Sequence, residues 1–417
     1  MNVVLMISDD WSPLAKCYGD TVVQTPHIDR LAAKGTVFHN AFCTTPTCAA
    51  SRANLLTGMY SHQHRQYGHS HGPHHFRTRE DVTALPAVLS KSGMKSGLCG
   101  KSHIAPHEIY GFTSWQETPG LALFSNRAVQ QRAEKCLQSF GDTPFYLHCA
   151  SGYPHRTGGN YDRNTYGEEL AADDVLYQPA EVLVPAYLPD TPEVRQDIAE
   201  YYTFITRFDR FVGDTIQAVE DAGKLDETMF ILLSDHGMPF PGAKASPFEA
   251  GHHCPLIITH PDGLGAGQHC DALVNWCDIM PTVLESMGVP RSEWPSGLTG
   301  SSLLPLLKNP EAEWRDLTFY SHSFHEVTNY FPYRIARGKR YKYVRCLAPQ
   351  LPLPLGTDLF DSISYQSILQ TGGSADRPLN RLLHHWKEAF FDLETDPYEK
   401  ENLIDQPDLQ PIIQDYR

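Results

Sequence analysis

Short apolar runs alternate with helix-forming segments along most of this chain, and this alternation restricts the fold more than any other feature. Turn-forming residues bound each run, as is typical of strands that are buried on both faces. Such strands, separated by helices, predict an α/β fold with a large, mostly parallel sheet flanked by helices. The strands are predicted at 3–7, 96–99, 144–150, 229–233 and 255–260.

The predicted helices carry start and stop signals. A helix follows Thr25-Pro26, and another is predicted over 83–91. A longer helix begins at Thr191-Pro192 and stops near Gly223, in the pattern of a first-turn proline and a terminal glycine. Its apolar residues recur at helical spacing, which places them in the core. They are Ile198, Ile205, Phe208, Val212, Ile216 and Val219.

The last quarter of the chain has a different pattern. RIARGKRYKYVRC (334–346) predicts an antiparallel hairpin that turns at Gly338, and RPLNRLLHHWKEAFF (377–391) predicts one helix. We therefore divide the chain into a large domain, 1–308, which should hold the active site, and a smaller C-terminal domain, 309–417. The smaller domain is expected to be α+β, with an antiparallel sheet, and to close the substrate pocket.

The 417 residues carry a formal net charge of -15, which argues against nucleic acid as a partner because that role needs a basic face. The negative net charge still allows an anionic ligand, since a few converging cations outweigh the net charge locally. No apolar run is long enough to span a membrane, and MNVVLMISDD has no basic leader or cleavage site. As written, the sequence predicts a cytoplasmic protein, or a periplasmic or secreted one if a leader was removed.

Polar residues follow four of the predicted strands, and ligands of open α/β sheets bind beyond the carboxyl ends of strands. The first strand leads to Asp9-Asp10, and the run 229–233 leads to Asp235-His236. Paired carboxylates repel each other unless a cation lies between them, so these residues predict a metal site. The alternative is that each pair only caps a loop or a turn. The other two strand ends carry Lys101, His103, His155 and Arg156.

Ten cysteines show no paired CxxC spacing, which predicts reduced, buried thiols, with Cys48 as the exception. Cys48 lies in TCAASRANLLTG (47–58), where the residues that follow it favour a helix. It would begin this helix, where free N–H groups and the helix dipole favour an anion. Arg52 lies four residues on and one turn above, so a nucleophile and a permanent cation would face the same spot.

CAASR (48–52), continued by Leu56-Thr57-Gly58, resembles the signature Cys-x-Pro/Ala-Ser-Arg-x-x-x-Leu-Thr-Gly of the sulfatase family, part of the alkaline phosphatase superfamily. The resemblance covers nearly the whole chain. Further segments similar to this family are 25–42, 234–244, 248–258 and 396–403. Segments similar to its heparan N-sulfatase subgroup are 67–76, 100–106, 153–156, 239–241 and 321–334.

This resemblance implies that a maturation enzyme oxidises Cys48 to formylglycine, whose hydrate attacks sulfur. It also implies one divalent cation, calcium in the first place, with manganese or magnesium as alternatives. The implied ligands are Asp9, Asp10, Asp235, His236 and the modified Cys48. Two positions depart from the expected pattern: Ala50 stands where proline is commoner, and His236 where the N-sulfatase subgroup is expected to carry asparagine.

The same resemblance assigns roles to five further side chains. Arg52 and Lys101 would hold the hydrate in place, and His103 would be the base that breaks down the sulfated intermediate. His155 and Lys244 would contact the sulfate, with His155 as the acid that protonates the leaving group.

A histidine-rich stretch lies between 62 and 75, and we interpret it as a polar wall of the sugar pocket. A separate metal site is the alternative, but the spacing fits no tetrahedral pattern. The stretch contains His62, His64, His69, His71, His74 and His75. The predicted substrate contacts are His74, His75, Arg156, His325, Glu326 and Arg334.

The combined expectation is an exo-acting hydrolase of N-sulfated glucosamine, with homodimerisation as an option. The first alternative is an O-sulfatase of another sulfated polysaccharide. The second is a phosphodiesterase or phosphonate monoester hydrolase of the same fold; two-zinc relatives commonly carry Asp-x-x-x-His, whereas Asp209 is followed at that position by Gly213. The third is an inactive protein that binds sulfated glycans without turnover.

Overall fold

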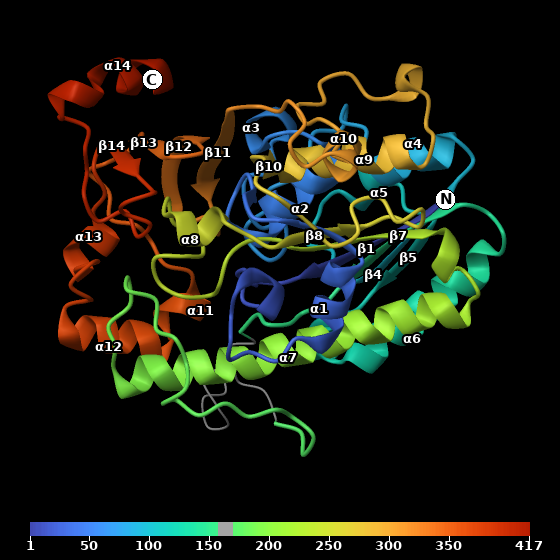
Figure 1. The fold of residues 1–417 in the computed structure, drawn as a ribbon, viewed down its shortest axis with the longest axis horizontal. Coiled ribbons are helices and arrows are strands. Elements are labelled where there is room, and N and C mark those ends of the chain that lie inside the picture. Colours follow the sequence, from blue (N-terminus) through green and yellow to red (C-terminus); the bar gives the residue numbers. More distant parts are fainter. Residues whose placement is uncertain (157–169) are drawn as a thin grey trace.

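The computed structural model describes residues 1–156 and 170–417, and its centre is an eight-stranded sheet (Figure 1). Within the described residues, all of its strands run parallel except β8, which is antiparallel to both neighbours. The predicted mostly parallel sheet is therefore confirmed, although the short edge strands β5 and β9 were not predicted. In order across the sheet the strands are β5 (Ser114–Glu117), β4 (Lys95–Gly100), β6 (Phe145–Ala150), β1 (Asn2–Ser8), β7 (Thr228–Ser234), β8 (Leu256–Thr259), β2 (Gly35–Phe38) and β9 (Gln268–Cys270).

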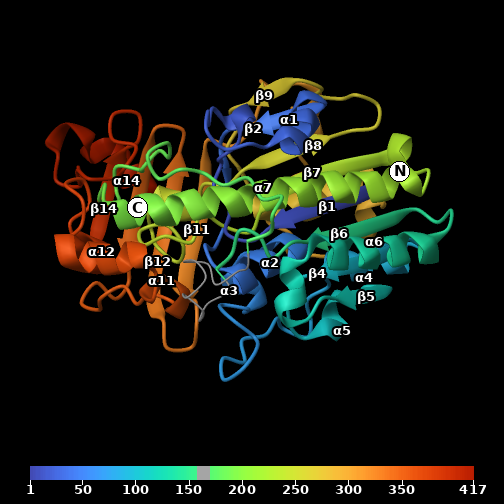
Figure 2. The same cartoon turned by 90° about the horizontal axis from the view of Figure 1, so that it is seen from below.

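Helices cover both faces of this sheet (Figures 1 and 2). One face packs against α1 (Pro26–Ala33), α6 (Asn126–Phe140) and α7 (Pro192–Asp221). The other packs against α2 (Cys48–Thr57), α4 (Leu85–Lys91), α9 (Ile279–Ser286) and α10 (Leu304–Lys308). Shorter helices are α3 (Ser61–His64), α5 (His107–Tyr110) and α8 (Glu249–His252).

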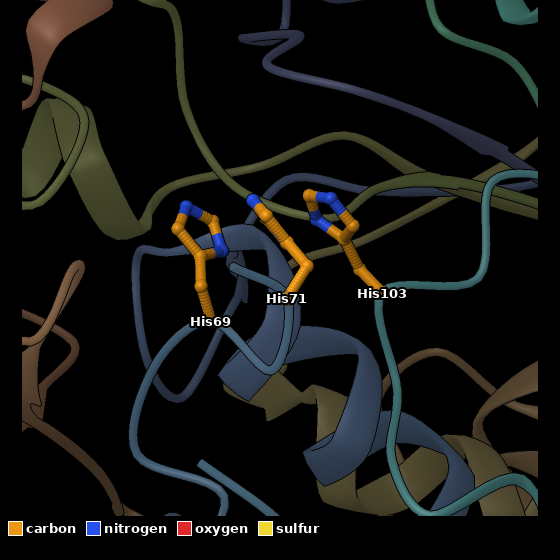
Figure 3. Close-up of side chains that lie close together, drawn as sticks. All are labelled: His69, His71 and His103. Atoms are coloured by element: carbon orange, nitrogen blue, oxygen red, sulfur yellow. The ribbon is translucent and has the colours of Figure 1, made fainter. Parts of the chain in front are cut away.

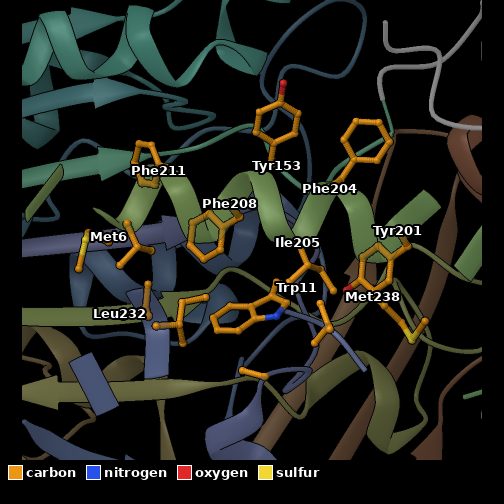
Figure 4. Close-up of a cluster of buried hydrophobic side chains, with 14 of the residues drawn as sticks. Met6, Trp11, Tyr153, Tyr201, Phe204, Ile205, Phe208, Phe211, Leu232 and Met238 are labelled. Atoms are coloured by element: carbon orange, nitrogen blue, oxygen red, sulfur yellow. The ribbon is translucent and has the colours of Figure 1, made fainter. Parts of the chain in front are cut away.

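The long helix α7 begins and ends where its sequence signals predict. The hydroxyl of Thr191 accepts a hydrogen bond from the amide of Val194, and the helix stops just before Gly223, whose φ is 69°. In Figure 4, Ile205 and Phe208 lie in the cluster with Met6 of β1 and Leu232 of β7. The predicted core residues of this helix are buried, except Ile216, which is partly buried.

A second, antiparallel sheet forms the C-terminal part of the molecule, and it contains the predicted hairpin. The four strands are β11 (Leu317–Phe324), β12 (Tyr330–Gly338), β13 (Tyr341–Cys346) and β14 (Glu388–Asp392). This sheet packs on Phe42 and Leu273, next to the small sheet of β3 (Ala41–Phe42) and β10 (Val274–Asn275). The helices around it are α11 (Thr357–Phe360), α12 (Ile363–Thr371), α13 (Leu379–Leu383) and α14 (Gln410–Tyr416). The proposed boundary near residue 308 stays a prediction.

The prediction of one helix over 377–391 is wrong. The segment forms the short helix α13 and then the strand β14, which pairs with β13. Ala389 and Phe391 join one apolar cluster, whereas Phe390 joins another on the opposite side. This alternation is that of a strand, and pairing with β13 outweighs the helical spacing of the leucines.

The ten cysteines are all unpaired, and all except Cys17 are buried, as the prediction of buried thiols required. Among the described residues, no helix is both long and apolar enough to cross a membrane.

Candidate active site

The carboxyl ends of β1 and β7 lie side by side and carry the predicted metal ligands. Asp9 and Asp10 follow β1, and Asp235 and His236 follow β7. Asp235 Oδ1 accepts hydrogen bonds from the backbone amides of Asp10, at 3.0 Å, and of His236, at 2.9 Å. These bonds fix the two strand ends to each other, and all four side chains are buried.

Cys48 is the first residue of α2, as predicted, and its Sγ lies 3.3 Å from Nε2 of His236. The residue before it, Thr47, is extended and makes no side-chain cap, so the first amides of the helix keep their partial positive charge. Ser51 donates its hydroxyl hydrogen to the carbonyl of Asp235, which ties α2 to the end of β7. Burial raises the pKa of the Cys48 thiol, so the unmodified side chain is a poor nucleophile at neutral pH.

Arg52 and Lys101 are directed at the carboxylates of this cluster. Arg52 Nε and Nη2 donate to Oδ2 of Asp235 at 3.1 and 2.9 Å, and Nη2 lies 3.5 Å from Oδ1 of Asp9. The ammonium group of Lys101 forms an ion pair with Oδ2 of Asp9. Both predicted cations thus reach the predicted metal ligands.

Lys244 and His155 meet on the other side of Asp10, together with a residue that the sequence did not indicate. Lys244 Nζ lies 2.9 Å from Asp10 and 2.8 Å from Asp358 of α11. His155 Nε2 lies 3.9 Å from Asp10 and 4.0 Å from Asp358. No motif singles out Asp358, because its role depends on how the C-terminal part folds back over the sheet.

Contacts between the buried carboxylates and cations set the pKa values of the groups in this cluster. Burial alone would raise the pKa of Asp10, but neighbouring cations hold it at about 2. Burial and then the adjacent Asp9 raise the pKa of Asp235 to about 6. Burial lowers the pKa of His236, yet Asp235 and Asp10 raise it well above its usual value. The carboxylates therefore favour a positive charge in the space between them, His236 and Cys48.

These residues fit a divalent cation. Ligand atoms of Asp9, Cys48, Asp235 and His236 all lie within 4.8 Å of one another, as do those of Asp10, Cys48 and His155. Within the described residues, the buried Oδ1 of Asp9 has no hydrogen-bond donor. A buried carboxylate oxygen without a donor is a natural metal ligand.

A cavity of about 500 Å³ opens beside this cluster, and half of the predicted site residues line it. Its wall includes His69 and His71 of the histidine-rich stretch, whose role as a wall of a sugar pocket stays a prediction. It also includes Asp358 and Asp361 from the C-terminal part. The predicted residues that line it are Asp9, His74, Lys101, His103, His155, Arg156, His325 and Glu326.

His75 and Arg334, two predicted substrate contacts, are not brought into this cavity. His75 is exposed and has a φ of 56°, whereas the preceding His74 lines the cavity. Arg334 lines a different cavity, beside His62, because its position on β12 directs it there and its Nη1 donates to the carbonyl of Tyr333 at 2.8 Å. Side-chain direction alternates along a strand, and the sequence pattern did not define which face Arg334 occupies.

Arg156 lines the cavity, but its guanidinium group is engaged elsewhere. Nη1 and Nη2 donate to the two carboxylate oxygens of Asp197 at 2.6 and 2.9 Å, and Nε donates to the carbonyl of Pro239. This buried, bidentate ion pair links the segment after β6 to α7, and the role of Arg156 as a substrate contact stays a prediction.

Asp209 is not part of the site. Its carboxylate accepts hydrogen bonds from the amides of His27 and Ile28 at the start of α1, and it therefore caps that helix. This structural role agrees with the sequence, in which Gly213 stands where the Asp-x-x-x-His pattern of two-zinc relatives has its histidine.

Two family models match the chain: "Sulfatase" over residues 1–289 and "N-sulphoglucosamine sulphohydrolase, C-terminal" over 243–350. The chain is 33% identical to human N-sulphoglucosamine sulphohydrolase over 99% of this chain and 88% of that protein. It is 27% identical to an ulvan-active sulfatase of Formosa agariphila over 100% of this chain and 73% of the relative.

Solved structures share the fold at lower identity. The phosphonate monoester hydrolase of Agrobacterium radiobacter superposes with a TM-score of 0.73 at 19% identity, covering 99% of this chain and 93% of that one. A protein solved with its substrate D-glucosamine-2-N,6-O-disulfate superposes with a TM-score of 0.69 at 18% identity, covering 100% and 95%. Sulfatases generally use a divalent cation and a formylglycine. The chain belongs to the sulfatase family and is a hydrolase of sulfate or sulfamate groups on saccharides.

Proposed function

We propose that this sulfatase is an exo-acting N-sulfoglucosamine sulfohydrolase of heparan-type chains. The observation that carries the proposal is the 33% identity with the human N-sulphoglucosamine sulphohydrolase over 99% of the chain, which includes the C-terminal region. In the reaction the N–S bond breaks, the amine takes up a proton, and sulfate leaves with an oxygen that comes from water.

Cys48 holds the nucleophile in this proposal, after a formylglycine-generating maturation enzyme has oxidised it. The formylglycine hydrate supplies the attacking oxygen. The position at the start of α2 supports this role, because free amides and the helix dipole stabilise negative charge there. Cys48 is only 1% exposed, so the maturation enzyme must reach it before α2 packs against the sheet.

Asp9, Asp10, Asp235 and His236 hold the divalent cation, for which calcium is our first choice. Three carboxylates provide the hard oxygen ligands that calcium prefers, while His236 makes manganese more acceptable. When bound, the ion withdraws charge from the sulfate oxygens and lowers the pKa of the nucleophile. Arg52, Lys101 and Lys244 already oppose the three carboxylates, so the added ion leaves the site net positive for an anionic substrate.

His155, Lys244 and His103 handle the sulfate and the protons. His155 stands 3.9 Å from Asp10 and 4.0 Å from Asp358. Burial and then Lys244 lower its pKa, while Asp10 and Asp9 oppose this change. This arrangement suits the acid that protonates the departing amine. His103 also lines the cavity, and in this proposal it serves as the base in the second half of the reaction.

The size of the cavity supports exo action on a single terminal sugar. A volume of about 500 Å³ lies in the range of sites that enclose one small ligand. His325 and Glu326, from the turn after β11, and Asp358, from α11, close it on the C-terminal side.

The test is to offer N-sulfoglucosamine beside 6-O-sulfated N-acetylglucosamine and sulfated algal oligosaccharides. We expect sulfate release from the N-sulfated compound. Release only from the O-sulfated compounds would replace this proposal with an O-sulfatase, to which the 27% identity with ulvan-active sulfatases points. An aryl phosphodiester, assayed beside an aryl sulfate, tests the phosphonate monoester hydrolase alternative in the same experiment.

A further inference from the structure

Three histidines from two separate loops form a compact cluster in the wall of the cavity. His69 and His71 come from the loop after α3, and His103 comes from the loop after β4. Their nearest ring nitrogens all lie within 4.8 Å of one another. Figure 3 shows the three rings side by side, with His71 between the other two. This cluster is distinct from the carboxylate ligands at the ends of β1 and β7.

The backbone holds the first of these loops in place. The amide of His69 donates to the carbonyl of His325 at 3.1 Å, and the amide of Phe76 donates to the carbonyl of His69 at 3.1 Å. Gly68 is required here, because a Cβ at this position would lie 2.6 Å from the carbonyl oxygen of His325. The rings are therefore arranged by a fixed loop that is attached to the C-terminal sheet.

Several nitrogens of the cluster are buried without partners. His69 is only 8% exposed, and its Nδ1 and the Nδ1 of His103 have no hydrogen-bond partner within the described residues. The Nε2 atoms of His69 and His325 share one hydrogen bond of 3.0 Å. Buried polar atoms without partners are unfavourable, so such a group indicates a missing ligand. His71 is exposed, which leaves a path from solvent to the cluster.

The cluster is also ready to bind a cation without first losing protons. Burial lowers the pKa of His69 and His103. Partial desolvation, followed by the charges of His74 and Lys101, lowers the pKa of His71. Neutral imidazole nitrogen is the ligand that zinc, copper, nickel and cobalt ions prefer, whereas calcium prefers oxygen.

We propose that His69, His71 and His103 form a second metal site, which takes a divalent transition-metal ion of the zinc class. Three imidazole nitrogens provide the ligands, and the fourth position faces the cavity. The two sites differ in chemistry: carboxylates bind the hard resident cation, and imidazoles select the softer ion. The spacing within the histidine-rich stretch gave no metal pattern because the third ligand comes from a different loop.

The consequence of binding rests on the proposed function, in which His103 is the base. A zinc-class ion that binds its ring nitrogen removes this base and places a positive charge beside Lys101. Zinc should therefore inhibit turnover reversibly, and a chelator that spares calcium should restore it.

The test uses the full-length protein saturated with calcium and titrated with Co²⁺, followed by visible d–d absorption. We expect one additional equivalent with the intense bands of a four-coordinate ion, and displacement of these bands by Zn²⁺. His71→Gln and His69→Leu should each weaken Co²⁺ binding by more than about tenfold. Loss of a direct ligand should cost at least as much as loss of a hydrogen-bond partner of a ligand, which costs about that much or more. His75→Gln is the matched control in the same loop, and it should keep the wild-type affinity because His75 lies outside the cavity.

The site would be refuted if calcium-saturated protein bound no further Co²⁺. The same holds if the bands survived unchanged in both His71→Gln and His69→Leu while thermal unfolding showed that these variants fold. Zinc binding that depends on the three histidines but leaves turnover intact would support the site and contradict the role of His103 as base. The failure of the metal proposal can thus be told apart from a failure of the proposed function.

Discussion

The two sides of the active-site cavity are built in different ways. On the side of the large sheet, the reactive groups follow directly from strand ends, and Asp235 fixes them through the amides of Asp10 and His236. On the C-terminal side, contributions such as Asp358 and His325 come from a one-turn helix and a turn between strands. The metal ligands and Cys48 are thus fixed at the ends of two central strands and the start of α2, whereas the C-terminal contributions depend on a short helix and a turn that pack over the sheet.

The most severe test of this comparison is Cys48→Ala. We expect turnover to be lost, because alanine cannot be converted to formylglycine and the only hydroxyl in the first turn of α2, that of Ser51, is bonded to the carbonyl of Asp235. The fold should survive, since alanine favours the helix and little volume is removed. Sulfate release and a thermal unfolding curve check both parts. Residual turnover near the wild-type level would show that the strand-end side does not hold the nucleophile.

Asp235→Asn should have the next largest effect, on both metal content and stability. It breaks a buried ion pair with Arg52, which typically costs about 3–5 kcal/mol of stability, and it removes a metal ligand. After a chelator that spares calcium has removed zinc-class ions from the histidine cluster, we expect elemental analysis to show about one divalent ion per wild-type chain, bound at the carboxylate site, and loss of this ion in the variant. An active variant without metal would contradict the assignment of Asp235.

Asp358→Asn tests the C-terminal side and should have a smaller effect. The change removes a charge 2.8 Å from Lys244 and 4.0 Å from His155, so both are less well positioned. We expect kcat to fall below wild type by about tenfold to a hundredfold, which is at or below the low end of what acid catalysis contributes, because His155 itself is kept. Asp361→Asn, at an exposed position in the same cavity wall, is the control and should change kcat much less. Equal effects of the two substitutions would remove the special role of Asp358.

The smallest effect concerns His148, a buried residue of β6 in the large sheet. Burial, and then the charge of Arg52, lower its pKa to about 3. Because the folded pKa lies below the ordinary value of about 6.5, the neutral ring stabilises the fold above pH 6.5, and this contribution is lost as pH falls toward 3. Between pH 6.5 and 5 the loss is about 2 kcal/mol.

His148→Gln should remove that part of the acid sensitivity. Urea unfolding at pH 7 and pH 5 measures it, and the difference between the two pH values should be smaller in the variant than in wild type. Identical pH dependence in both proteins would mean that His148 titrates normally in the folded state.

The sequence was sufficient to predict the residues at the strand ends of the large sheet. It was not sufficient to predict much of what the C-terminal part contributes to the cavity. Parallel strands bring their carboxyl ends to one edge, so the positions of Asp9, Asp235 and Lys101 followed from the order of apolar runs. The location of Asp358 depends on the packing of α11 over the sheet, which no local pattern encodes. The error over 377–391 has the same origin, because β14 exists only through its pairing with β13.

The central claim is that Cys48, once converted to formylglycine, carries the hydrolysis of an N-sulfated sugar. Mass spectrometry of the peptide that contains Cys48 tests it most directly, when preparations of different specific activity toward N-sulfoglucosamine are compared. The account predicts that the aldehyde form is present and that its fraction rises in proportion to activity. Full activity in a preparation in which Cys48 is entirely unmodified thiol would contradict it.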